Sequence, residues 1–227
     1  MNHWKKFGAA AVAAAVFLGA LPAASAGELA GEEIAMAKIE ANKLVPRKKV
    51  NFVFRSRVEG EVTGKKTEDG EDTMTAEAYF LTPYCYVMNV QLAQGRTGRV
   101  DFEALSDAAK KYQIRLLLNC KNINRDALKN ATITVRRGSR GITPVSRRYT
   151  LIQRAKGGSL GGDSWGKIGV VLDIAADDVD TSLPVEVTLK GYAGYSATFA
   201  FPRADGAFDS YDTKDTTFSW TPLYDSV

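Results

Sequence analysis

The sequence predicts an all-β protein, a two-layer β-sandwich with an N-terminal helix and one short internal helix. Apolar and polar residues alternate with a period of two over several short segments, which is typical of strands that bury one face. Turn residues separate these segments at short intervals, as they do in sandwiches and barrels. We favour an immunoglobulin-like strand order, with a closed barrel as the alternative, because a sequence does not show closure.

The first 26 residues have the order of a secretory signal peptide. Lys5 and Lys6 precede an apolar run from Phe7 to Leu21, and Ala24-Ser25-Ala26 offers a small-residue cleavage site before Gly27. The alanine-rich apolar run favours a bacterial origin. We therefore expect an exported protein, residues 27–227, in the periplasm or on the outer cell surface.

Removal of the signal peptide also removes the only histidine, His3. The mature chain then has no Ser-His-Asp triad and no Cys-His pair, and it lacks the commonest zinc ligand. Loss of Lys5 and Lys6 lowers the net charge from +4 to +2, which gives no argument for a nucleic-acid partner. No apolar run of the mature chain is long enough to span a bilayer. We expect no cofactor.

Residues 27–49 are expected to form a helix or leader that ends at Pro46. Residues 50–202 are taken as one β-sandwich domain, and 203–227 as a C-terminal strand, Thr216–Trp220, with a tail. Strands are expected at Val50–Phe54, Ala76–Phe80, Tyr84–Leu92, Ile114–Cys120, Ile133–Val135, Tyr149–Gln153, Ile168–Ile174, Val185–Leu189 and Ala197–Phe201.

Two hairpins and one internal helix complete the expected fold. The segment 185–201 turns at Ala193-Gly194, and Tyr149–Gln153 is expected to pair back on Ile133–Val135. Asp101 can cap the internal helix, whose apolar stripe comprises Leu105, Ala108, Ala109 and Tyr112.

The mature chain has two cysteines, Cys85 and Cys120. An even number in an oxidising compartment favours one disulfide, which would contribute roughly 3–4 kcal/mol by restricting the unfolded chain. Two buried free thiols are the alternative. Cys120 is expected on the apolar face of its strand, whereas Cys85 is expected on the opposite face of its own strand. A bridge between them would therefore need a bulge near Pro83.

Positive charge is concentrated in one part of the chain, because no acidic residue occurs between Ala131 and Gly162. The connection 138–146 is flanked by five arginines: Arg136, Arg137, Arg140, Arg147 and Arg148. They predict a positive hairpin tip that binds an anionic partner. Alternatively, the acidic C-terminal region folds over this hairpin within the same molecule.

Three aspartates after the strand Ile168–Ile174 are a weak candidate for a calcium site: Asp177, Asp178 and Asp180. Their spacing does not match an EF-hand loop. The alternative is a solvated turn in which an aspartate bonds its own backbone.

These observations favour a non-catalytic exported module of the bacterial cell envelope. It would bind a protein or anionic envelope component, or contribute to a surface or periplasmic assembly in a pilus-associated or adhesin-like role. One alternative is a carboxylate-dependent hydrolase of envelope polysaccharide. A cleft that holds two acidic side chains would favour this alternative. The other is a carbohydrate-binding module, whose stacking residues would be the C-terminal aromatics Phe208, Tyr211, Phe218, Trp220 and Tyr224.

Overall fold

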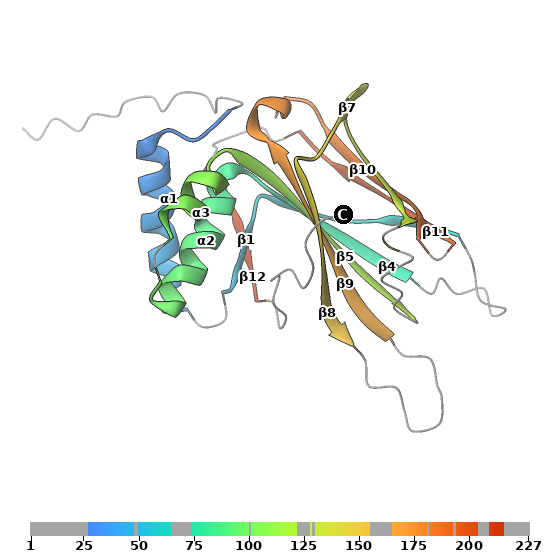
Figure 1. Cartoon of the computed structure of the whole chain (residues 1–227), viewed down its shortest axis with the longest axis horizontal. Helices are drawn as coiled ribbons and strands as arrows, with labels where there is room; N and C mark the ends of the chain where they lie inside the picture. The colour runs from blue at the N-terminus through green and yellow to red at the C-terminus, as the bar shows by residue number, and fades with distance from the viewer. Residues whose placement is uncertain are drawn as a thin grey trace, which may run out of the picture.

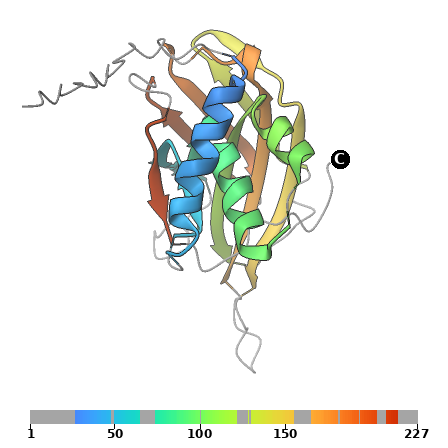
Figure 2. The same cartoon turned by 90° about the vertical axis from the view of Figure 1, so that its left-hand side faces the viewer.

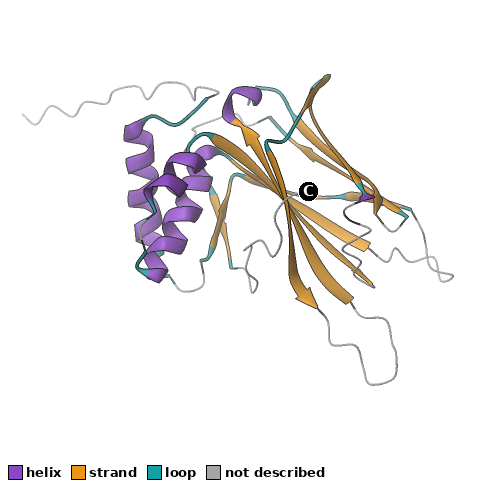
Figure 3. Ribbon diagram, in the orientation of Figure 1, coloured by secondary structure: helices purple, strands orange, loops and turns teal. Residues whose placement is uncertain are grey.

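The computed structural model describes residues 27–47, 50–64, 74–99, 101–121, 128, 130–154, 165–180, 182–192, 194–203 and 209–215. For residues 120–121, 151–154 and 165–166 it describes the backbone alone. The described chain is mainly β, as predicted, and has three α-helices (Figures 1 and 3).

Two five-stranded antiparallel sheets form the body of the protein. The first has the order β3 (Glu61–Thr63), β11 (Tyr195–Phe201), β10 (Val185–Tyr192), β6 (Thr132–Arg137), β7 (Arg140–Ile142). The second has the order β2 (Ser56–Glu59), β4 (Met74–Leu81), β5 (Lys111–Lys121), β9 (Trp165–Ala175), β8 (Ser146–Arg154). A separate pair joins β1 (Phe52–Phe54) to β12 (Asp212–Lys214), and the short 3₁₀ helix Ala176–Asp178 follows β9.

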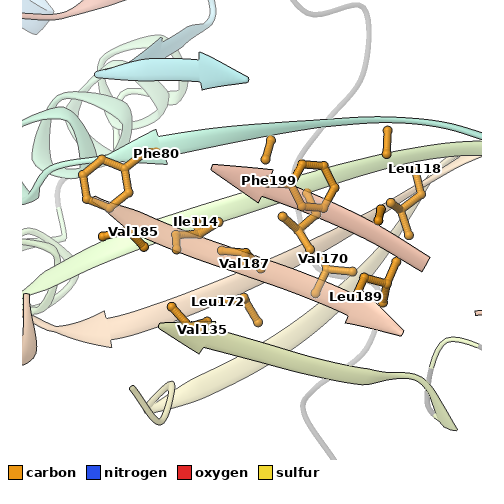
Figure 4. Packing of buried hydrophobic residues seen from close by; sticks show 14 of the residues in the cluster. Phe80, Ile114, Leu118, Val135, Val170, Leu172, Val185, Val187, Leu189 and Phe199 are labelled. Atoms are coloured by element: carbon orange, nitrogen blue, oxygen red, sulfur yellow. The ribbon is translucent and has the colours of Figure 1, made fainter. Parts of the chain in front are cut away.

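The main core lies between the two sheets, where alternate residues of facing strands meet. In Figure 4, Ile114 and Leu172 of the second sheet pack with Val187 and Phe199 of the first. The predicted hairpin 185–201 is confirmed, with Val187 opposite Phe199. Its polar residues alternate with the buried ones, so each strand keeps one face toward the core.

The chain passes from one sheet to the other at Gly60. β2 pairs with β4 in the second sheet, and β3 pairs with β11 in the first. A Cβ atom on Gly60 would lie 2.6 Å from Cε1 of Phe199, a residue with no exposed surface. Because the bend presses the backbone against this buried ring, only glycine fits at the crossing point.

A layer of three helices covers one end of the second sheet on the side away from the first sheet (Figures 1 and 2). These are α1 (Gly31–Leu44), α2 (Pro83–Thr97) and α3 (Phe102–Ala108). They enclose a second apolar cluster with β1 and with Tyr79 and Leu81 of β4. Among the described residues, no helix combines the length and apolar character needed to cross a membrane.

The strand predicted at Tyr84–Leu92 is wrong, because this segment is helix α2. Thr82 caps the helix by accepting a 3.3 Å hydrogen bond from the backbone of Cys85, and Pro83 occupies its first turn. The segment fits two periods equally well. Its apolar residues alternate as in a strand, but the residues that are buried follow a helical spacing: Tyr84, Val87, Met88 and Leu92. The internal helix and its cap are confirmed, with Oδ1 of Asp101 accepting from Ala104 at 2.9 Å. Tyr112, which the prediction placed in the apolar stripe of this helix, lies instead on β5 in the core between the sheets.

The predicted pairing of Tyr149–Gln153 with Ile133–Val135 is also wrong. β8 pairs with β9 in the second sheet, whereas β6 pairs with β10 and with β7 in the first. The immunoglobulin-like strand order is not confirmed. The connection 138–146 therefore contains a strand of its own and then crosses between the sheets.

The predicted disulfide between Cys85 and Cys120 does not form, since Cys85 is a buried free cysteine. In the β4–β5 pair, Cys120 lies opposite Met74, while Leu81, which leads into α2, lies opposite Gln113. Seven residues of strand separate these positions by about 23 Å. A disulfide needs Cα atoms roughly 4.4–6.8 Å apart, so the register of β4 and β5 prevents the bridge.

Candidate functional site

The outer face of the second sheet, the side away from the first sheet, carries several rows of polar side chains. Its residues form rows across the strands, because cross-strand partners point to the same side. One row joins Leu81 to Gln113 and Asp173 beneath the helices. At the far end a row joins Thr75 to Asn119 and Lys167. The helix layer covers the first row and leaves the far end open (Figure 1).

A groove of about 520 Å³ lies at this open end. Strands β2, β4, β5 and β9 and the bend at Gly60 form its walls. Its lining consists of Arg57, Glu59, Gly60, Val62, Met74, Thr75, Ala76, Glu77, Leu117, Asn119 and Lys167. Cations, anions and neutral hydrogen-bonding groups are mixed in this set, so the groove suits a polar ligand rather than an apolar one.

Glu77 is the most constrained polar residue of the groove. Its carboxylate accepts from Nε of Arg57 at 2.7 Å, the hydroxyl of Tyr79 at 2.7 Å and Nζ of Lys214 at 3.3 Å. Burial alone would raise the pKa of Glu77, but the bonds from Tyr79 and Arg57 and the charge of Lys214 hold it below its usual value. Burial and the bond to Glu77 raise the pKa of Tyr79. Glu77 is therefore an ionised carboxylate that three neighbours hold in place.

A second carboxylate, Glu59, lies directly opposite Glu77 in the β2–β4 pair. Arg57 bridges the two, with Nη2 3.2 Å from Oε1 of Glu59, whose side chain is 80% exposed. A catalytic pair needs one carboxyl with a raised pKa to donate a proton. The lowered pKa of Glu77 makes this carboxylate a hydrogen-bond acceptor and not the proton donor of such a pair.

A second polar cluster lies beneath the helices around Asp173, which is 3% exposed. Asp173 accepts from Nε2 of Gln113 at 2.7 Å, the hydroxyl of Ser146 at 2.6 Å and Nη2 of Arg148 at 2.6 Å. Burial would lower the pKa of Arg148, but the charge of Asp173 and a bond with Tyr86 raise it. Hydrogen bonds and the Arg148–Asp173 ion pair hold the cluster together, although Nε of Arg148 is buried without a hydrogen-bond partner among the described residues.

Two of the five predicted binding arginines, Arg147 and Arg148, lie on β8 and point to opposite faces of the second sheet. Arg148 forms the ion pair with Asp173. Arg147 donates to the backbone carbonyls of Leu128 at 3.2 Å and Ala131 at 3.1 Å. Its guanidinium also lies 5.0 Å from the ring centroid of Tyr149.

The other three arginines lie on the β6–β7 hairpin of the first sheet. Arg136 donates to the carbonyl of Ser139 at 3.3 Å. Nη1 of Arg137 donates to the carbonyl of Asp178 at 3.0 Å, and Arg140 lies 3.6 Å from the carboxylate of Asp178. The five arginines are thus distributed over both sheets, and acidic residues of the same chain contact three of them.

Two of the three aspartates considered for calcium, Asp178 and Asp180, have other partners in the structure. Asp178 pairs with Arg140, and Oδ1 of Asp180 accepts from the backbone of Ser182 at 3.0 Å and from its hydroxyl at 2.6 Å. These two bonds lower the pKa of Asp180. In the part of the chain that the structure describes, no three His, Cys, Asp or Glu residues are grouped as metal ligands.

Of the C-terminal aromatics, only Tyr211 lies within the described residues. It is partly buried against the helix cluster, and its hydroxyl lies 3.5 Å from Oε2 of Glu40. The others, Phe208, Phe218, Trp220 and Tyr224, lie outside them.

The sequence prediction did not single out any residue of the groove. The sequence indicates the groove only through alternation in two strands, where the polar residues Thr75, Glu77 and Asn119 alternate with apolar residues. That alternation shows which side chains point outward but not which strands are neighbours.

Comparison of the chain with protein-family models, with curated proteins and with solved structures finds no match.

Proposed function

We propose that this protein is an exported, non-catalytic binding module of the bacterial cell envelope, and that it binds its partner in the groove of the second sheet. The observation that carries the proposal is the state of Glu77. A carboxylate held by Arg57, Tyr79 and Lys214 cannot donate a proton, but it keeps the surrounding donors in fixed positions. A rigid groove with fixed polar groups is a binding surface.

The sequence before Gly27 supports export. Lys5, Lys6, the apolar run Phe7–Leu21 and the small residues Ala24-Ser25-Ala26 have the order of a secretory signal peptide. The backbone N–H of Leu29 donates to the carbonyl of Ala109 at 3.0 Å, so the first residues of the mature chain attach to the helix layer.

The composition of the groove favours a segment of a partner protein over an anionic polymer. Glu59 and Glu77 would repel a continuous row of negative charges, whereas Thr75 and Asn119 can exchange hydrogen bonds with a polar chain. Such a module fits a surface or periplasmic assembly, including a pilus-associated or adhesin-like one.

The test is crosslinking in intact cells followed by capture of the full mature protein. Charge reversal at the groove, E59K with K167E, is expected to abolish capture of the crosslinked partner. The matched control, E186K with K190E, makes the same changes at exposed positions of β10 in the first sheet and is expected to retain it. Equal capture by both variants would exclude the groove, and absence of any crosslinked partner would exclude a binding module.

A polysaccharide hydrolase is the second candidate, because Glu59 and Glu77 face the same groove as cross-strand partners. It predicts that purified protein degrades envelope polysaccharide and that both E59Q and E77Q abolish this activity. No release of reducing sugar by the wild-type protein would exclude it.

A further inference from the structure

The groove holds two opposite charges that are well separated across the sheet. Glu59 lies on β2 and Lys167 on β9, and both side chains line the groove. Strands β4 and β5 run between them, so the two residues are three strand spacings, about 14 Å, apart across the sheet. The register also places them one row, or about 7 Å, apart along the strands. Together these offsets put their Cα atoms about 16 Å apart.

Glu59 is the carboxylate of the groove that a ligand can reach. Three donors already occupy its neighbour Glu77, whose side chain is 17% exposed. The side chain of Glu59 is 80% exposed, and its Oε1 pairs with Nη2 of Arg57 at 3.2 Å. Exposed ion pairs of this kind contribute little to stability, so a ligand cation can bind Glu59 in competition with Arg57.

Lys167 supplies the opposite charge at the β9 end of the groove. Its side chain is partly exposed. An ammonium group has three N–H donors, so it can bind a ligand carboxylate together with another acceptor. A ligand with one cation and one anion therefore meets a matching charge at each end, whereas a ligand with two like charges meets a repulsive one at one end.

The groups between the two charges suit a polypeptide backbone. Thr75 and Asn119 are cross-strand partners, and Nδ2 of Asn119 lies 3.5 Å from Oγ1 of Thr75. A side-chain amide has two N–H donors and a carbonyl acceptor, and this long contact uses one of the donors. Asn119 can therefore donate to and accept from a peptide group of a ligand that crosses the strands.

The separation of the two charges sets the spacing within such a ligand. In an extended segment, side chains four residues apart point to the same side and lie about 13 Å apart. Flexible charged side chains can cover the remaining difference of about 3 Å. Side chains two residues apart, at about 7 Å, would not reach both ends of the groove.

We infer that the groove binds an extended segment of a partner protein that carries a basic and an acidic side chain four residues apart. The basic side chain pairs with Glu59 and the acidic one with Lys167, while Asn119 holds the backbone between them. This inference rests on the proposed function, since it names the kind of segment that the groove would bind.

The test measures the binding of three blocked peptides to the full mature protein by NMR titration. Low ionic strength is used because salt screens exposed charges. SKTSTES carries one charge of each sign, SKTSTKS carries two lysines and SETSTES carries two glutamates, in each case four residues apart. The wild-type protein is expected to bind SKTSTES about three- to fivefold more tightly than either of the other peptides.

Single charge reversals should change this preference in opposite directions. E59K makes both ends of the groove positive and should prefer SETSTES, whereas K167E makes both ends negative and should prefer SKTSTKS. The matched control E186K changes an exposed glutamate of the first sheet and should keep the wild-type order. Single substitutions are used because a free peptide can bind a doubly reversed groove in the opposite chain direction.

Absence of peptide binding by the wild-type protein would overturn the inference, and so would a preference that E59K and K167E leave unchanged. If E59K does not fold, E59Q should bind SKTSTES and SETSTES equally, and a retained preference would overturn the inference in the same way. Crosslinking of the wild-type chain in cells tests the proposed function separately. A captured partner without the peptide preference would refute this inference alone, and the peptide preference without a captured partner would refute the proposed function alone.

Discussion

Replacement of Asp173 by alanine gives the sharpest test of how the second sheet and the helices are held together. Asp173 accepts hydrogen bonds from Gln113, Ser146 and Arg148, at 2.7, 2.6 and 2.6 Å. The alanine variant leaves the Arg148 guanidinium and the Gln113 amide without their acceptor in a buried site. Such losses cost about 3–5 kcal/mol.

We expect D173A to fall at the lower end of this range, with a loss of about 3 kcal/mol in the free energy of unfolding. The reason is that the Arg148 side chain is 27% exposed, so water can partly solvate the abandoned charge. For a domain of this size, that corresponds to a fall in Tm of about 6–12 °C. Urea denaturation followed by far-ultraviolet circular dichroism measures the first quantity, and a thermal melt measures the second.

Two further variants make the measurement specific. D178A removes a partly exposed partner of Arg140, 3.6 Å away, and is expected to cost less than about 1 kcal/mol. D173A combined with R148M removes both charges, so it should be more stable than D173A alone. A loss below about 1 kcal/mol in D173A would refute the argument, because the acceptor would then not be needed. A double variant no more stable than D173A would refute it equally.

Three other measurements test the fold and the groove. G60A should lose about 1–3 kcal/mol of unfolding free energy, because its Cβ would lie 2.6 Å from the Phe199 ring. Adding F199L to G60A should restore part of this free energy, and urea denaturation measures the stability of both variants. Burial raises the pKa of Cys85 to about 11, so its thiol should resist thiol reagents at pH 8 until the protein unfolds. Fast labelling of this thiol in the native protein would contradict its buried position. The folded-state pKa of Glu77 is lowered, so its charge stabilises the fold above the ordinary value of 4.5, and this contribution is lost as the pH falls through the lowered pKa. Denaturation of wild type and E77Q from pH 3 to 7 should show a difference that shrinks toward acid, and a pH-independent difference would contradict the role given to Glu77.

Local chemistry explains which elements could be predicted from the sequence. The hairpin 185–201 combines strict alternation with a tight turn, and the internal helix has an aspartate at its N-cap. Each of these signals lies within a few residues along the chain. Alternation does not identify helix α2, because Tyr84–Leu92 fits both the strand period and the helix period; its local signal is Pro83 in the first turn.

The candidate site could not be predicted in the same way, because it depends on register between distant strands. Glu59 and Glu77 become partners through the β2–β4 pair, and Asn119 meets Lys167 through the β5–β9 pair. A shift of one residue in either pair would turn these side chains to the other face. The cysteines show the same limit, because only the register of β4 and β5 separates Cys85 from Cys120.

The amino-acid order by itself determined that the chain is rich in one-sided strands, that histidine chemistry is absent after residue 26, and that the basic and acidic residues are segregated along the chain. Only the tertiary structure decided which strands are neighbours, which face the helices cover, and that Arg148 and Arg140 pair with aspartates of the same chain. The physical reason is that periodicity and capping act over a few residues, whereas pairing and burial depend on contacts between residues far apart in the sequence.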